Sequence, residues 1–404
     1  MNGKSHICSF VVVIFLLVLY IFNIVPQGLP TIFGTREYLS ILSCFIIFPQ
    51  YHRNKIYRGI IFANWTQFLF SIITILVNGT TDFWYVQFGL RNILYINGAL
   101  LIVSLLPKKK SIDSFVILIL LAICINSIIA TVCFVVPSAM NVLVSFQQIA
   151  DPDKIDKTIM WSVRMLGLGC GNFFVGGIIN GIGIILTFWL MTRNKINGIL
   201  GLFIIAFLLI VGVFIARTTI VGLIVGLLLF ARSTSVRNIV LLFCGGVFLI
   251  LVIQSSDLFS TVDASHAFEF FSTDIESQRS SQTMESLSEM YHVKFDIVTL
   301  LIGDGLSKTP TGEYYMNTDV GYLRNILYFG LFGTIFGYFY YELYILKKLY
   351  KQDKTLKYFV LSMGLFLVLL NFKGLPDFNF MVFLLLAFYI VRRKEFKNEN
   401  IACY

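Results

Sequence analysis

Two short segments of this 404-residue sequence carry side chains that could act on a charged substrate. In the first segment, Arg217 stands between apolar runs and is followed by Thr218 and Thr219. Arginine has a permanent charge and a planar fork of donors, which suit it to bind phosphate oxygens. A charge within apolar membrane sequence costs at least about 2.5–3.5 kcal/mol on insertion scales, so it is usually functional. The alternative is that Arg217 caps a turn and reaches lipid phosphates at the membrane surface.

The second segment combines two carboxylates with an arginine. Asp304 lies within residues 301–305, and Asp319 comes shortly before Tyr322 and Arg324. A carboxylate can accept the proton of an attacking hydroxyl group, and an arginine can stabilise the negative charge that develops on a leaving group. These residues therefore predict group transfer with an anionic leaving group. Two structural alternatives stay open, since Asp319 could cap the helix that follows it or pair with Arg324.

The elements that would position these residues are membrane-spanning helices. The chain is 57% hydrophobic and 13% charged, whereas roughly a quarter of the residues of a soluble domain are charged. Crossing a bilayer takes about 20 apolar residues of helix. We therefore predict an all-α, polytopic integral membrane protein with a single membrane domain over residues 1–404. We expect about twelve spans, near residues 7–25, 37–50, 57–77, 87–106, 112–136, 173–191, 197–216, 218–231, 237–253, 320–346, 357–372 and 377–391.

The charge of the connecting loops predicts the orientation of these spans. With both termini in the cytoplasm, most of the 31 basic residues fall in short inside loops and most of the 22 acidic residues fall outside. Two outside loops are long, at residues 137–172 and 254–319, and loops of this length are usually functional. We expect both to be periplasmic.

The same charge pattern argues against other classes of protein. The net charge of +9 is spread in clusters between apolar runs, which disfavours nucleic-acid binding. The seven cysteines are scattered and have no metal-ligand spacing. We therefore expect no metal and no cofactor.

The layout and the two segments resemble the family of O-antigen polymerases (Wzy) and the related O-antigen ligases (WaaL). Members typically have a small-residue-Arg turn between two spans and then a long periplasmic loop. That loop closes on Gly-x-Gly and on a polar residue four positions before a leucine, which opens a helix containing Gly-x-x-Gly. The corresponding features here are Ala216-Arg217-Thr218, Gly303 to Gly305, Asp319 before Leu323, and Gly330 to Gly333. Ligases usually carry His-Asn where this chain has Asp319-Val320, which favours the polymerases.

The resemblance implies a GT-C-like fold in the bacterial inner membrane. The implied enzyme is a glycosyltransferase that transfers a growing glycan from undecaprenyl pyrophosphate to the next lipid-linked repeat unit at the periplasmic face. Its partners would be undecaprenyl-pyrophosphate-linked oligosaccharide, the lipid bilayer and a polysaccharide chain-length regulator.

The resemblance also guides the choice of site residues. Some polymerases carry Arg-x10-Gly in both large loops. Here Arg164 is followed by Gly176, one residue too far along, and Arg279 has no such glycine. The expected catalytic residues are Asp319 and Asp304. The expected substrate-binding residues are Arg217, Arg324, Arg164, Arg279 and Tyr322.

Two other functions fit parts of the pattern. Twelve spans with inside termini are common among transporters, including flippases of lipid-linked oligosaccharides, although acids are scarce within the predicted spans and the second loop is long. An O-antigen ligase, which transfers finished polymer to a lipid core, is the nearer alternative.

Overall fold

The computed structural model describes residues 2–30, 33–107, 110–148, 164–169, 173–231, 289–293 and 295–402. This part of the chain contains helices and no strand, so the predicted all-α class is confirmed for it. Within the described ranges, five helices are long and apolar enough to cross a membrane, as expected of a multi-pass membrane protein. They are α3 (Lys55–Asn78), α4 (Trp84–Ser104), α5 (Ile112–Val135), α8 (Phe173–Thr192) and α9 (Gly198–Ile215).

The remaining described helices are shorter, less apolar or interrupted. They are α1 (Asn2–Phe22), α2 (Thr35–Tyr51), α6 (Pro137–Phe146), α10 (Thr219–Ala231), α14 (Ile297–Ile302), η2 (Tyr315–Asn317), α15 (Gly321–Gly333), η3 (Thr334–Phe339), α16 (Tyr340–Tyr350), η4 (Lys354–Leu356), α17 (Lys357–Leu370) and α18 (Asn379–Ala402). Every predicted span overlaps one of the described helices except that at 237–253, which lies outside the described residues. The count of twelve crossings and the GT-C-like fold stay predictions.

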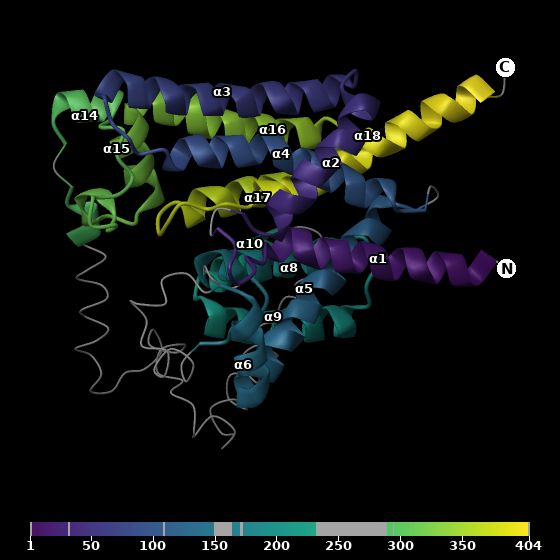
Figure 1. Cartoon of the computed structure of the whole chain (residues 1–404). Helices are drawn as coiled ribbons and strands as arrows, with labels where there is room; N and C mark the ends of the chain where they lie inside the picture. The colour runs from purple at the N-terminus through teal and green to yellow at the C-terminus, as the bar shows by residue number, and fades with distance from the viewer. Residues whose placement is uncertain are drawn as a thin grey trace. The chain divides into compact units, whose positions relative to one another are not determined.

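The chain divides into two compact units, each described here by itself. Unit 1 comprises Met1–Arg36 and Lys109–Thr273, and unit 2 comprises Glu37–Lys108 and Asp274–Tyr404. Figure 1 shows the helices of both units coloured along the chain. The single membrane domain over residues 1–404 stays a prediction.

Glycines hold the helices of unit 1 close together. A Cβ atom on Gly222 of α10 would lie 2.3 Å from the Cα atom of Gly181 on α8. Residues without side chains let helix backbones approach closely, which favours association in a membrane. The turn between α9 and α10 is therefore held against α8.

We expect Gly222→Ala to lower the thermal stability of the protein, since the added methyl group must force α8 and α10 apart at a cost of about 1–3 kcal/mol. Gly198→Ala is the matched control, because a Cβ atom there meets nothing within 4 Å. Thermal unfolding of the purified protein in detergent measures both variants. Unfolding of Gly222→Ala at or above the wild-type temperature would contradict the close approach of the two helices.

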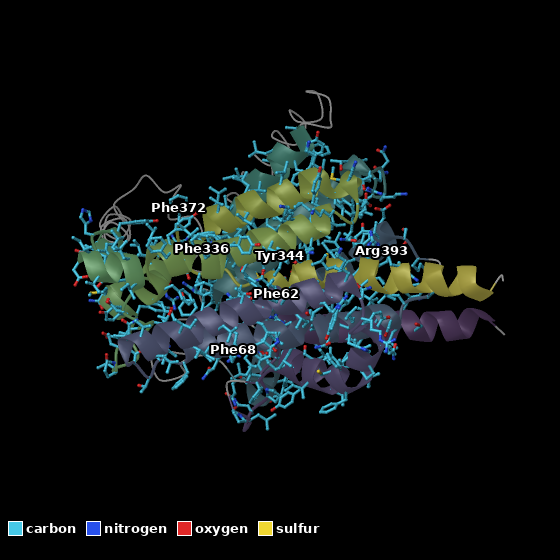
Figure 2. The ribbon with its side chains drawn as sticks, turned by 90° about the horizontal axis from the view of Figure 1, so that it is seen from above. Phe62, Phe68, Phe336, Tyr344, Phe372 and Arg393 are labelled. Carbon is cyan, nitrogen blue, oxygen red and sulfur yellow. The ribbon has the colours of Figure 1, made fainter. Side chains whose placement is uncertain are left out.

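Unit 2 is built on α3, which packs against α4 and α16, while α18 packs against α4 and α16 against α17. Phe62 of α3, Phe336 of η3 and Phe372 after α17 are each more than half exposed (Figure 2). Exposed aromatic side chains on helices of this hydropathy are expected of a surface that contacts lipid.

The expected single span at 320–346 is interrupted. Gly330 within α15 has φ 67° and ψ 178°, which are not helical values, and the π-helix η3 follows before α16 begins. Figure 1 shows α15 lying crosswise to α3 and α16. Gly330 permits this break because it has no Cβ atom, which would lie 2.3 Å from the carbonyl oxygen of Leu301.

Candidate functional site

Four of the expected site residues lie in unit 2, on the loop 303–320 and at the start of α15, and this loop is held against residues 79–83 between α3 and α4. We call this the turn end of unit 2. The loop 303–320 is tied to it through Asp82, whose carboxylate accepts hydrogen bonds from the Ser307 amide and hydroxyl groups, both at 2.6 Å. The amide of Lys308 donates to the same oxygen at 3.2 Å. One carboxylate therefore fixes the loop that carries Asp304 and leads to Asp319.

The glycines shared with the polymerase pattern make a close backbone contact. Gly303 has φ 78°, and a Cβ atom on it would lie 2.4 Å from both the Gly330 amide nitrogen and the Tyr328 carbonyl oxygen. The amide of Asp304 donates to the Leu327 carbonyl at 2.7 Å. The close packing of the loop on α15 therefore accounts for glycine at both Gly303 and Gly330.

The side chain of Asp304 links α14 to the loop 303–320 through two hydrogen bonds. One carboxylate oxygen accepts a hydrogen bond from the Thr299 hydroxyl at 2.8 Å, and the other accepts one from the Tyr315 hydroxyl at 3.1 Å. Burial and the charge of Asp304 raise the pKa of Tyr315, so this donor stays protonated at neutral pH. Asp304 therefore has a structural role in the described loop, and its catalytic role stays a prediction.

Arg324 is buried between two aromatic rings. Its guanidinium carbon lies 4.5 Å from the centre of the Tyr314 ring and 5.3 Å from that of Trp84, and the residue is 7% exposed. Its Nη1 lies 3.4 Å from Oδ1 of Asp319, which is long for a charge-assisted hydrogen bond. Its Nε has no hydrogen-bond partner in the described residues. The open alternative that Arg324 pairs with Asp319 is thus confirmed as a loose ion pair.

Asp319 does not cap α15, so that alternative is wrong. The helix begins at Gly321, its N-cap residue is Val320, and no side chain caps it. The backbone of Val320 is extended, at φ −62° and ψ 119°, which places Asp319 one residue before the cap. The carboxylate of Asp319 instead meets Arg324, and its side chain is 42% exposed.

The surroundings of Asp319 suit a group that accepts a proton. Partial burial raises its pKa above the ordinary value, while the charges of Arg324 and Lys373 and hydrogen bonds from Arg324 and Tyr314 act in the opposite direction. A general base works best when its pKa lies nearer the working pH. Lys373 is exposed and lies between α17 and α18.

Tyr322 anchors the start of α15. Its hydroxyl donates to the Val368 carbonyl of α17 at 2.7 Å. The centre of its ring lies 5.0 Å from that of Phe372 and 5.6 Å from that of Phe339. These contacts give it a packing role, and its expected contact with substrate stays a prediction.

Arg217 lies in the turn between α9 and α10 of unit 1, as the sequence predicts. The amide of Ile220 donates to the Arg217 carbonyl at 3.1 Å, so α10 starts directly after it. The Thr219 hydroxyl donates to the Gly177 carbonyl of α8, also at 3.1 Å. A Cβ atom on Gly177 would lie 2.5 Å from the Thr218 hydroxyl oxygen, so the arginine stands on a tightly packed turn.

A second arginine lies close to this turn in unit 1. The guanidinium carbon of Arg164 is 4.6 Å from the centre of the Phe173 ring at the start of α8. Burial and the charge of Arg217 lower the pKa of Arg164. Two cations that repel one another at the end of apolar helices create a strongly positive region, which favours a bound anion.

The expected site residues therefore fall into two groups. Asp319, Asp304, Arg324 and Tyr322 belong to unit 2, Arg217 and Arg164 belong to unit 1, and Arg279 lies outside the described residues. Sequence reasoning missed the residues that surround Asp319 and Arg324 in space, which are Trp84, Tyr314, Asp82 and Lys373. Lys373 alone had a signal, as a basic residue in a short loop expected to lie outside.

Among the described residues, no three of His, Cys, Asp and Glu come together as a metal site requires. Comparison of the chain with protein-family models, with curated proteins and with solved structures found no match.

Proposed function

We propose that this chain is a membrane glycosyltransferase that polymerises lipid-linked repeat units of a surface polysaccharide, as O-antigen polymerases do. The observation that carries the proposal is Asp319, a partly exposed carboxylate of raised pKa beside the buried Arg324. It lies at an end of the helices of unit 2, where a sugar attached to a membrane lipid would be presented.

In the proposed reaction, Asp319 accepts the proton of a hydroxyl group on the acceptor repeat unit. The hydroxyl oxygen forms a bond to the anomeric carbon of the donor glycan, and the bond from that carbon to the pyrophosphate oxygen breaks. Undecaprenyl pyrophosphate leaves with the electron pair of that bond. The cations of Arg324 and Lys373 favour the ionised form of Asp319 before it accepts the proton.

Both substrates of such a reaction are pyrophosphates of a membrane lipid. The arginine pair of unit 1 supports the binding of one of them, because Arg164 and Arg217 can each donate in parallel to phosphate oxygens. An anion bound there would also relieve the repulsion between the two guanidinium groups.

A strain that lacks the gene tests this function through the glycans on its lipid core. We expect a core that carries one repeat unit, since attachment continues when polymerisation stops. A core without any repeat unit would instead indicate a flippase or a ligase.

The pH dependence of polymerisation follows from the pKa of Asp319. The base acts only when ionised, so the rate falls as the pH drops through its pKa, which lies above the ordinary value of 3.8. Lys373→Ala removes a charge that lowers this pKa, so we expect the acid limb of the rate profile to move to higher pH. Lys308→Ala, an exposed lysine on the same loop, should leave the limb in place. An acid limb that does not move in Lys373→Ala would contradict the assignment of the base.

A lipid-linked oligosaccharide flippase is the second candidate function. It is favoured by the interrupted helix at Gly330 and by a buried glutamate within α16, since broken helices and buried acids are typical of transport pathways. The glycan profile of the deletion strain separates the two candidates. An O-antigen ligase has no observation in its favour beyond the resemblance.

A further inference from the structure

A carboxyl group is buried among the helices of unit 2, away from the Asp319 site. Glu342 of α16 is 2% exposed, and its Oε1 accepts a hydrogen bond from the side-chain amide of Asn379 at 2.7 Å. No cationic side chain of the described residues forms an ion pair with it. An acid in this position within a predicted span is functional by default, because burying it is costly.

A second acid and a buried hydroxyl group lie near Glu342. Asp377, in the segment before α18, is close enough for its charge to act on Glu342. The hydroxyl of Tyr338 is fully buried, lies within reach of the Glu342 charge, and faces the side chain of Asn371. A hydroxyl group between a carboxyl group and an amide can relay a proton, because it both donates and accepts hydrogen bonds.

The backbone around Glu342 is irregular. The π-helix η3 ends immediately before α16, and such segments are frequent at functional sites. Residues 375–378 are not helical, and α18 begins only at Asn379, which is 2% exposed. Non-helical backbone at membrane depth is tolerated where it is buried in protein or lines a polar pathway.

Burial and mutual repulsion determine whether Glu342 and Asp377 are protonated. An isolated buried carboxylate is strongly disfavoured, and a second carboxylate nearby adds repulsion. The N-terminus of α18 offers about half a positive charge, which offsets only part of this cost. We propose that Glu342 is an intramembrane proton-binding site, which exchanges its proton with the turn end of unit 2 through the segment 371–378.

The neighbouring groups fit a proton better than a metal ion. The titratable groups that face Glu342 are Asp377, Tyr338 and Tyr341, and the Tyr341 hydroxyl is already occupied as a donor to Asn64 of α3 at 2.6 Å. The lysines of η4 and α17, Lys354 and Lys357, are exposed. Hard metal cations are held in proteins by about six or more oxygen ligands, whereas one of the contacts to Glu342 comes from an amide nitrogen.

The segment 371–378 leads from this site toward α15. Asn371 is fully buried, and its side chain lies beside the Tyr338 hydroxyl. A Cβ atom on Gly321 would lie 2.8 Å from Oδ1 of Asn371. A line of polar groups thus runs from Glu342 past Tyr338 and Asn371 to the start of α15. The proposal is independent of the proposed glycosyl transfer.

Infrared spectroscopy of the full-length protein in liposomes tests the proposal. At neutral pH we expect the C=O stretch of a protonated carboxylic acid, which shifts in D2O and disappears as the pH is raised. Glu342→Gln should lose this band. Glu313→Gln, the same change on an exposed turn, should keep it.

Three results would overturn the proposal. They are absence of the band in the wild type at neutral pH, its persistence in Glu342→Gln, and its removal from the wild type by sodium chloride but not by choline chloride. The last result would make sodium the ligand. If Glu342→Gln does not fold, Glu342→Asp keeps an acid at the position, and a shift of the band frequency then assigns it.

Discussion

Asp319→Asn is expected to reduce polymerisation by a factor of about 10²–10⁴, the usual contribution of a general base. The asparagine keeps the size of the side chain and can still accept a hydrogen bond from Arg324, but it cannot take up the proton. Because Asp319 does not cap α15 and its ion pair with Arg324 is long and partly exposed, the variant should fold and keep most of its thermal stability. The measurement is the length distribution of the glycan at matched protein level.

Glu313→Gln serves as the control for Asp319→Asn, since it changes an exposed carboxylate of the same loop to an amide. It should make polymer of normal length. Near-normal polymer from Asp319→Asn itself would rule out this residue as the base. Loss of protein from the membrane would instead assign Asp319 a structural role as the partner of Arg324.

Arg217→Ala is expected to abolish long polymer while the protein remains inserted and abundant. Removing one preorganised donor from a developing anion typically costs a factor of about 10²–10³ in rate. Arg217→Lys should also be poor, because an ammonium group cannot reproduce the planar fork of a guanidinium group. Arg53→Ala, an exposed arginine between α2 and α3, is the matched control and should polymerise normally.

A double variant, in which both Arg164 and Arg217 are changed to alanine, tests whether the two arginines bind the same anion or act separately. If both arginines hold the same pyrophosphate, the losses in Arg164→Ala and Arg217→Ala should not add in the double variant. Polymer of normal amount and length from Arg217→Ala would remove this residue from the site and leave it as a surface anchor.

The positions of the helices could be predicted from the sequence because hydropathy and loop charge are local properties. The predicted span at 57–77 lies within α3, and that at 112–136 coincides with α5 to within one residue. The break at Gly330 could not be predicted in this way. It depends on the approach of Leu301 to a glycine nearly 30 residues away, and a glycine in a long apolar run has the same local appearance whether or not the helix continues.

The candidate site could be predicted only in part, because contacts between distant segments complete it. Asp319 and Arg324 are close in sequence, so their pairing is one of the alternatives that the sequence leaves open. Trp84, which covers Arg324, and Asp82, which holds the loop at Ser307, lie more than 200 residues earlier. No pattern in the sequence of α4 indicates which distant side chain it will meet.

At two residues, the type and place in the sequence were not enough to predict the role of the side chain. Asp319 before a helix has the type and place of a capping residue, yet the backbone of Val320 takes that role. Glu342 stands in an apolar run at the end of the predicted span 320–346, and its type alone does not tell whether it faces the interior or the end of the helix. Its burial, which depends on contacts with distant helices, marks it as a candidate functional group.

The most direct test of the proposed function is a reaction of the purified chain, reconstituted in liposomes, with undecaprenyl-pyrophosphate-linked repeat units. The proposal predicts glycans that lengthen by whole repeat units, release of undecaprenyl pyrophosphate in equal amount, and the loss of both with Asp319→Asn. Repeat units that stay single while they move across the bilayer, or that are consumed only when a lipid core is added, would contradict it.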